Sequence, residues 1–179
     1  MKQLLHVLFA CVCLVAPLSA TVIVPADVAE LAHDAYVIAR GSVVAVDCRW
    51  ADGRRGIETV VTIEAETVLK GQLTHTVQFR VPGGTLGRYR NIVMGAPQFA
   101  VGQRVIVFLG ASGPEIPHLL GMSQGVYRVS ASEDGRTVVT PPALMPGVVG
   151  PVVRGAASRQ PTALSEFERD VRALAVERR

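Results

Sequence analysis

The sequence predicts a mostly β protein, a small antiparallel barrel or sandwich with one helix before it and one after it. Five or more short apolar segments alternate with turn residues along the middle of the chain, as in small all-β domains. A helical period occurs only near residues 26–35 and again near the C-terminus. Setting 20 of the 179 residues aside as a leader leaves 159, enough for one domain and too few for two.

The first 20 residues have the composition of a cleavable secretory signal peptide. Lys2 precedes an uncharged apolar run over residues 4–16, and Pro17, Leu18, Ser19 and Ala20 follow as a small-residue cleavage site. The run is shorter than the roughly 20 apolar residues of a membrane span. We expect cleavage near Ala20 and a periplasmic or extracellular mature chain without a transmembrane segment. An uncleaved anchor and a lipoprotein, from a loose lipobox at residues 8–11, are the alternatives.

Charge and cysteine content name no partner. The 18 basic and 15 acidic residues give a net charge of +3, too small an excess to indicate nucleic acid or a membrane surface. Cys11 and Cys13 would leave with the leader, so the mature chain keeps Cys48 alone and forms no internal disulfide. We interpret Cys48 as a small, half-buried strand residue; a reactive thiol or an intermolecular bridge is the alternative.

A short helix and a β-hairpin are expected after the leader. Residues 26–35 predict the helix, with Asp27 as its N-cap. A strand follows over 36–48, and Gly41 within it suggests a bulge or a sharp coil. The turn at 51–56 contains Asp-Gly between two apolar runs, which is a strong hairpin signal.

Residues 57–66 show the clearest period of two in the chain. Apolar side chains share one face and Glu58, Glu64 and Glu66 share the other, so a half-buried strand with its acids facing solvent is expected, ending at 69–71. Residues 85–100 lack a period and predict a long excursion. The remaining strands are expected at 77–81, 105–109, 118–122, 125–129 and 137–140. The run 105–109 has no polar alternation, which indicates burial on both faces.

The C-terminal region predicts a loop and then a helix. Prolines and glycines break the pattern between residues 141 and 161. An amphipathic helix is expected within 162–179, with Ser165 and Glu168 as a capping box. Its apolar positions are Leu164, Phe167, Val171 and Leu174. This stripe would either cover the barrel or, alternatively, dock a partner or a membrane surface.

Three segments in this order resemble the netrin-like module, the OB-type barrel of the tissue inhibitors of metalloproteinases. They are a helix leading into residues 36–46, a strand ending at 68–71, and the run 99–109. The resemblance covers about residues 27–130 and implies a small OB-like antiparallel barrel over 21–140. The chain also resembles uncharacterised exported bacterial proteins, in which a segment like 121–125 precedes the last strands.

The chain departs from the inhibitors where their mechanism resides. In that family the mature chain begins with a cysteine that chelates the zinc of the protease, and disulfides hold the ridge beside it. Here cleavage after Ala20 would leave Thr21 first and no cysteine pair. The resemblance therefore extends to the fold and to a link with protease regulation, but not to zinc chelation.

The residue pattern does not predict an enzyme, a metal site or a cofactor. His33, His75 and His118 are widely separated, with no HExxH or CxxC motif. No G-x-S-x-G motif is present, and Cys48 has no histidine placed beside it in the sequence. The strand acids are typical of a solvated face. An enzyme of unrecognised type would need a clustered polar pocket.

Aromatic and basic residues gather in two of the expected loops. They are Arg49, Trp50, Arg54 and Arg55 around the first turn, and Arg88, Tyr89 and Arg90 in the excursion. Loops at one end of an OB barrel form its usual ligand surface, and arginine with tryptophan or tyrosine dominates binding hot spots. The alternative is that the arginines are simply solvated and Trp50 caps the barrel.

These observations favour an exported, non-enzymatic binding module. Its expected partner is a protein in the cell envelope or outside the cell, and we do not expect it to be nucleic acid. The alternative function is OB-type binding of an oligosaccharide or of single-stranded nucleic acid through the same arginines and aromatic residues. Export argues against nucleic acid.

Overall fold

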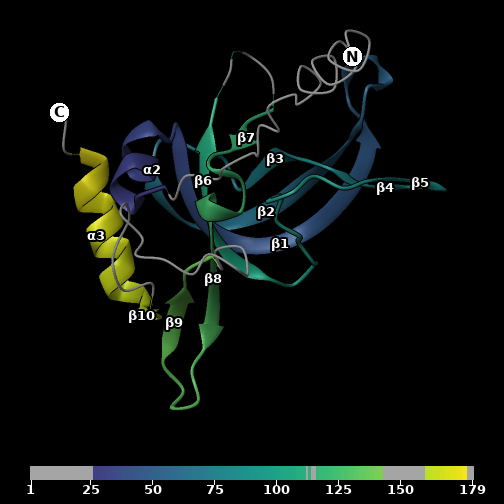
Figure 1. The fold of residues 1–179 in the computed structure, drawn as a ribbon. Coiled ribbons are helices and arrows are strands. Elements are labelled where there is room, and N and C mark those ends of the chain that lie inside the picture. The colour runs from purple at the N-terminus through teal and green to yellow at the C-terminus, as the bar shows by residue number, and fades with distance from the viewer. Residues whose placement is uncertain (1–25, 112, 114–115, 143–159, 177–179) are drawn as a thin grey trace, which may run out of the picture.

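The computed structural model describes residues 26–111, 113, 116–142 and 160–176 (Figure 1). The helices are α2 (Val28–Asp34) and α3 (Leu164–Val176), with 3₁₀ turns at Asp52–Arg54 and Met122–Gly125. The strands are β1 (Val37–Trp50), β2 (Ile57–Lys70), β3 (Thr76–Pro82), β4 (Gly84–Leu86), β5 (Tyr89–Asn91), β6 (Arg104–Gly110), β7 (His118–Leu119), β8 (Val126–Ala131), β9 (Thr137–Thr140) and β10 (Thr162–Ala163). The fold is therefore mostly β, with a helix near each end, as predicted. The expected leader, 1–20, and most of the expected linker, 143–159, lie outside the described residues.

Helix α2 begins at Val28, directly after its N-cap residue Asp27. The Asp27 carboxylate accepts a hydrogen bond from the backbone N–H of Ala29, and Glu30 reaches back to the N–H of Asp27. This reciprocal capping satisfies donors that have no partner within the helix. Leu31 and Ala32 are buried against the sheet, so the amphipathic pattern of the sequence is confirmed here.

Strand β1 pairs with two different strands. It lies antiparallel to β2 over nearly its whole length and antiparallel to β6 over Val37–Ser42. Gly41 is at the point where both pairings meet, and the register with β2 shifts between Arg40 and Gly41. A Cβ atom at Gly41 would lie 2.2 Å from the carbonyl oxygen of Glu64. This distance is too short for any side chain, so the position requires glycine. The bulge predicted at Gly41 is confirmed.

The strand pairings return to their starting point. The order runs β1–β2–β3–β7–β6, and β6 pairs again with β1. The link between β3 and β7 is parallel and short, through Arg80 and His118, whereas the others are antiparallel. Strands β8, β9 and β10 extend the sheet beyond β6, and the β8–β9 hairpin projects away from it (Figure 1). The strands β1, β2, β3, β7 and β6 thus form a continuous ring of pairings.

Strand β6 separates two apolar clusters. Val105, Val107 and Leu109 belong to a cluster formed with β1, β2 and β3. Ile106 and Phe108 face the opposite way, into a cluster that includes residues of α2 and α3. All five side chains are fully buried. This arrangement explains why the run 105–109 shows no polar alternation, and the prediction of burial on both faces is confirmed.

Helix α3 packs on the sheet of its own chain. The ring of Phe167 lies 4.7 Å from that of Tyr127, which in turn lies 5.6 Å from Phe108. Val171 is fully buried in the same cluster. Of the two fates considered for the apolar stripe, packing on the chain's own fold is the one observed. The expected capping box is wrong: the helix begins at Leu164, so Ser165 lies within its first turn, and Glu168 forms ion pairs.

Two further segments differ from the expectation. Residues 85–100 are not wholly irregular, because β4 and β5 form a short hairpin within them. The strand expected at 118–122 is shorter, because β7 ends at Leu119 and a 3₁₀ turn begins at Met122. Strand β7 pairs with β6 and β3, and β8 pairs with β9. None of the described helices is long and apolar enough to cross a membrane.

Candidate binding surface

The β4–β5 hairpin lies against the turn end of the β1–β2 ribbon. The N–H of Gly83 donates to the carbonyl of Ile57 at 2.8 Å, and the hydroxyl of Thr59 donates to the carbonyl of Gly83 at 2.7 Å. Gly84 makes the approach possible, since a Cβ there would lie 2.7 Å from Thr59 Oγ1 and 2.8 Å from Cys48 Sγ. Its φ of +144° is a second reason why glycine is needed.

This arrangement brings the two predicted loops together. The rings of Trp50 and Tyr89 meet edge to face, with centroids 5.3 Å apart and planes at 60°. The guanidinium carbon of Arg88 lies 5.1 Å from the centre of the Tyr89 ring, and its Nη2 donates to the Tyr89 hydroxyl at 2.9 Å. Trp50 and Tyr89 remain 38% and 47% exposed. Trp50 is therefore part of an exposed aromatic pair rather than a buried cap.

The arginines around the pair differ in how their charge is balanced. Arg49 forms an ion pair with Glu58 at 2.7 Å, so this strand acid is not simply solvated. Arg54 and Arg55 lie exposed in the turn before β2. Within the described part of the chain, the side chains of Arg54, Arg55 and Arg90 form no hydrogen bond or ion pair. Three cationic groups thus stay available for a ligand.

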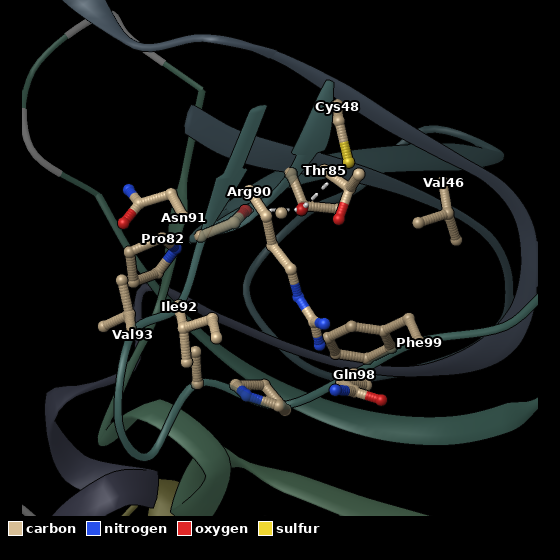
Figure 2. Close-up of a pocket in the computed structure, with 15 residues that line it drawn as sticks. Val46, Cys48, Pro82, Thr85, Arg90, Asn91, Ile92, Val93, Gln98 and Phe99 are labelled. Carbon is tan, nitrogen blue, oxygen red and sulfur yellow. Dashed lines mark hydrogen bonds between the residues drawn. The ribbon is translucent and has the colours of Figure 1, made fainter. Parts of the chain in front are cut away.

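A cavity of about 350 Å³ lies between the hairpin and β1, and Arg90 is at its rim (Figure 2). Its lining comes from the strands and from the segment after β5: Val46, Cys48, Thr59, Pro82, Gly83, Gly84, Thr85, Arg90, Asn91, Ile92, Val93, Ala96, Pro97, Gln98 and Phe99. Figure 2 shows Arg90 reaching across the cavity toward the end where Gln98 and Phe99 lie. The free thiol of Cys48 is half-buried in the wall, 3.5 Å from Thr59 Oγ1, as expected for a strand cysteine.

No family model, curated protein or solved structure matches this chain. The resemblance to the netrin-like module therefore stays a prediction, and the surface has to be interpreted from its own geometry.

A separate charged cluster holds the sheet and α3 together. Glu66 accepts from Arg104 at 2.7 Å and 3.0 Å and from Ser42 at 3.0 Å, and it also pairs with Arg40. The hydrogen bond from Arg104 is the main cause of a lowered pKa at Glu66, which burial opposes and Ser42 reinforces. The same contact raises the pKa of Arg104. Glu66 is therefore the shared anion of Arg40 and Arg104.

The structure keeps the histidines apart. His33 pairs with Asp34 at 2.9 Å beside the end of α2, His118 lies in β7, and His75 precedes β3. Across the described ranges, no three His, Cys, Asp or Glu side chains gather as a metal ion would require. A second cavity, of about 290 Å³, lies between α2, β9 and α3, away from the predicted loops.

The cavity itself was not predicted from the sequence. Its apolar wall comes from Ile92, Val93 and Phe99, in the segment that lacks any period, and Cys48 was interpreted as a half-buried strand residue rather than as part of a cavity. The glycine pair Gly83-Gly84 was the available signal, because adjacent glycines after a strand often mark a close approach of two backbones.

Proposed function

We propose that this chain is an exported, non-enzymatic module that binds a protein partner in the cell envelope or outside the cell. The binding surface consists of Trp50, Arg54, Arg55, Arg88, Tyr89 and Arg90. Its scaffold is a small OB-like barrel, formed by the five strands whose pairings run from β1 through β2, β3, β7 and β6 back to β1. A five-stranded ring in which sequence order and spatial order differ is the arrangement of an OB barrel.

The contact between Trp50 and Tyr89 carries this proposal. It joins two segments that are far apart in the sequence into one exposed aromatic face, at an end of the strands where OB barrels usually bind ligands. The aromatic pair supplies flat apolar area, and the exposed guanidinium groups of Arg54 and Arg55 supply directional donors. Such a combination is enriched at the centres of protein interfaces.

The charge of the surface indicates the chemistry of the partner. A partner that places carboxylates against Arg54 and Arg55 would form charge-assisted hydrogen bonds, which are about twice as strong as neutral ones. The resemblance to inhibitors of metalloproteinases supports a role in protease regulation. That role would rest on this surface, because no cysteine is expected at the mature N-terminus.

A capture experiment on envelope extract tests the surface. The full-length protein is exported in its own host, purified with its partners, and compared with a Trp50→Ala, Arg55→Ala double variant. We expect at least a tenfold loss of a specific protein from the double variant. An Arg169→Ala variant, altered on α3, should recover the same protein as the wild type. Equal recovery from all three proteins would sink the proposal.

The same preparation distinguishes the alternative function and tests export. Binding of an oligosaccharide or of single-stranded nucleic acid, in place of a protein, would favour the alternative function. Binding of nucleic acid would also weaken steeply with added salt, because it depends on phosphate contacts. N-terminal sequencing of the exported chain should give Thr21 as its first residue. Recovery of Met1 would contradict cleavage.

A further inference from the structure

We propose that the cavity beside Arg90 binds the carboxyl-terminal end of a partner chain whose last residue is apolar. The Arg90 guanidinium would bind the terminal carboxylate, while the wall formed by Ile92, Val93 and Phe99 would contact the side chain. This inference deepens the proposed function and rests on it, since the cavity adjoins the surface of Trp50 and Tyr89.

The charge at the cavity favours an anionic ligand. Arg90 is exposed at the cavity, and its guanidinium has no hydrogen bond or ion pair within the described residues. The residues that line the cavity include no aspartate and no glutamate. One anionic group from a ligand would therefore meet one unbalanced cation. A guanidinium offers a planar fork of donors that matches the two oxygens of a carboxylate.

The apolar wall of the cavity favours a ligand that also carries an apolar group. Ile92 is 69% exposed although it belongs to the lining, and Val46 and Phe99 are partly buried around it. A purely ionic ligand would gain nothing from these side chains, whereas an apolar group placed against them would leave water. A phosphate group, with more charge than one arginine balances and no apolar surface, fits this wall poorly.

The Arg90 guanidinium and the apolar wall line the same small cavity, so a ligand must carry its carboxylate and its apolar group close together. At the end of a peptide, the carboxylate and the last side chain leave from the same carbon atom, so both reach one small space. The carboxylate of an internal Asp or Glu lacks an apolar group beside it. At about 350 Å³, the cavity is near the lower limit for ligand pockets, which suits a terminal residue rather than a folded loop.

Polar groups in the lining could hold the peptide backbone. The side chains of Thr85 and Gln98 have no hydrogen bond to other described residues, and they lie among the residues around Arg90. A hydroxyl and an amide together offer donors and acceptors for one peptide unit. Capture of a terminal carboxylate is a known mode of peptide recognition.

The test compares free acids with amides. N-acetyl-glycyl-leucine, -valine and -phenylalanine, each as the free acid and as the C-terminal amide, are titrated into the full-length protein and followed by calorimetry. Fluorescence of Trp50, the one tryptophan of the sequence, is a second readout. We expect at least one acid to bind with a Kd of about 1 mM or tighter, and its amide to bind at least tenfold more weakly.

Variants assign the effect to Arg90. Arg90→Gln should reduce the affinity for the acid to that for the amide. Because this exposed side chain has no hydrogen bond or ion pair to another described residue, the fold should be unchanged, as circular dichroism will show. Arg136→Gln, in the β8–β9 turn, is the matched control and should bind as the wild type does. Equal affinity for acid and amide, no binding of any acid, or full competition by inorganic phosphate would each overturn the inference.

The outcome for the cavity can be separated from the outcome for the surface. If the peptides fail to bind but the Trp50→Ala, Arg55→Ala variant still loses its captured protein, the inference falls and the proposed function stands. If a captured protein is lost from Arg90→Gln and from a form of the partner lacking its last residue, both are supported.

Discussion

Arg40 Nε donates to Glu168 Oε1 at 2.7 Å and so joins β1 to α3 across 128 positions of sequence. Both side chains are largely shielded from water, at 14% and 12% exposed. Arg40 also donates to Thr67 Oγ1 at 2.6 Å and pairs with Glu66 on β2. A single guanidinium therefore connects the first strand, the second strand and the last helix.

Replacing Glu168 should weaken the attachment of α3. In Glu168→Gln, the largely buried guanidinium of Arg40 loses one of its two carboxylate partners and keeps the other, Glu66. We therefore expect the free energy of unfolding to fall by about 1–2 kcal/mol. Urea unfolding followed by circular dichroism measures it. Glu166→Gln, exposed in the first turn of the same helix, should cost at most about 0.5 kcal/mol. Equal effects of the two changes would contradict the role given to Arg40.

The lowered pKa of Glu66 predicts acid sensitivity. A carboxylate whose pKa is lower when folded contributes stability above the pH at which a free glutamate titrates, about 4.3, and loses it as the pH falls through the folded value. Glu66→Gln should be less stable than the wild type at pH 7 by about 1 kcal/mol, and the difference should shrink below pH 4. Thermal unfolding between pH 7 and pH 3 measures this. Glu64→Gln, at an exposed position of the same strand, is the control and should change the stability at pH 7 by less than about 0.5 kcal/mol.

Gly41→Ala should disrupt the sheet where β1 pairs with β2 and β6. The new methyl group would lie 2.2 Å from the Glu64 carbonyl oxygen, so the pairing must shift, and we expect a loss of about 3 kcal/mol or failure to fold. Gly102→Ala is the matched control because its Cβ meets nothing within 4 Å, although its positive φ costs about 1 kcal/mol. Chemical unfolding compares them. Similar losses of stability in the two variants would show that β1 and β2 can move apart at Gly41 at little cost.

Gly84→Ala should separate the hairpin from the ribbon without unfolding the protein. Its Cβ would collide with Thr59 and Cys48, so β4 must move away and the Trp50–Tyr89 contact should be lost. We expect a red shift of Trp50 emission and at least a tenfold loss of partner capture. Gly87→Ala, with a positive φ but open space, should keep both properties. Retained emission and capture in Gly84→Ala would show that the hairpin does not depend on this contact.

Local signals in the sequence were sufficient for the elements that depend on local physics. Asp27 predicts the start of α2, because an N-cap acts within one turn of the chain. The Asp52-Gly53 pair predicts the first turn, where Gly53 adopts a φ of +69°. The alternation of β2 and the uninterrupted apolar run of β6 follow from which faces are buried.

Features that depend on distant contacts could not be predicted in this way. Strands β4 and β5 have three residues each, too few for a period of two to be recognised. The pairing of β1 with β6 has no marker except Gly41, whose close neighbour, Glu64, belongs to another strand. Trp50 and Tyr89 were proposed as parts of one surface, but their contact depends on where Gly84 allows the hairpin to lie.

The pairings of β1 also affect the order in which the sheet can form. Ile38 in β1 pairs with Phe108 in β6, and Arg40 pairs with Glu168 in α3, so β1 acquires partners that are synthesised long after it. Long-range pairings of this kind slow folding, because loops must close before their contacts contribute. In a nascent chain, β1 should therefore lack these contacts until β6 and α3 have been made, and until then it should expose the apolar side chains that those elements later cover.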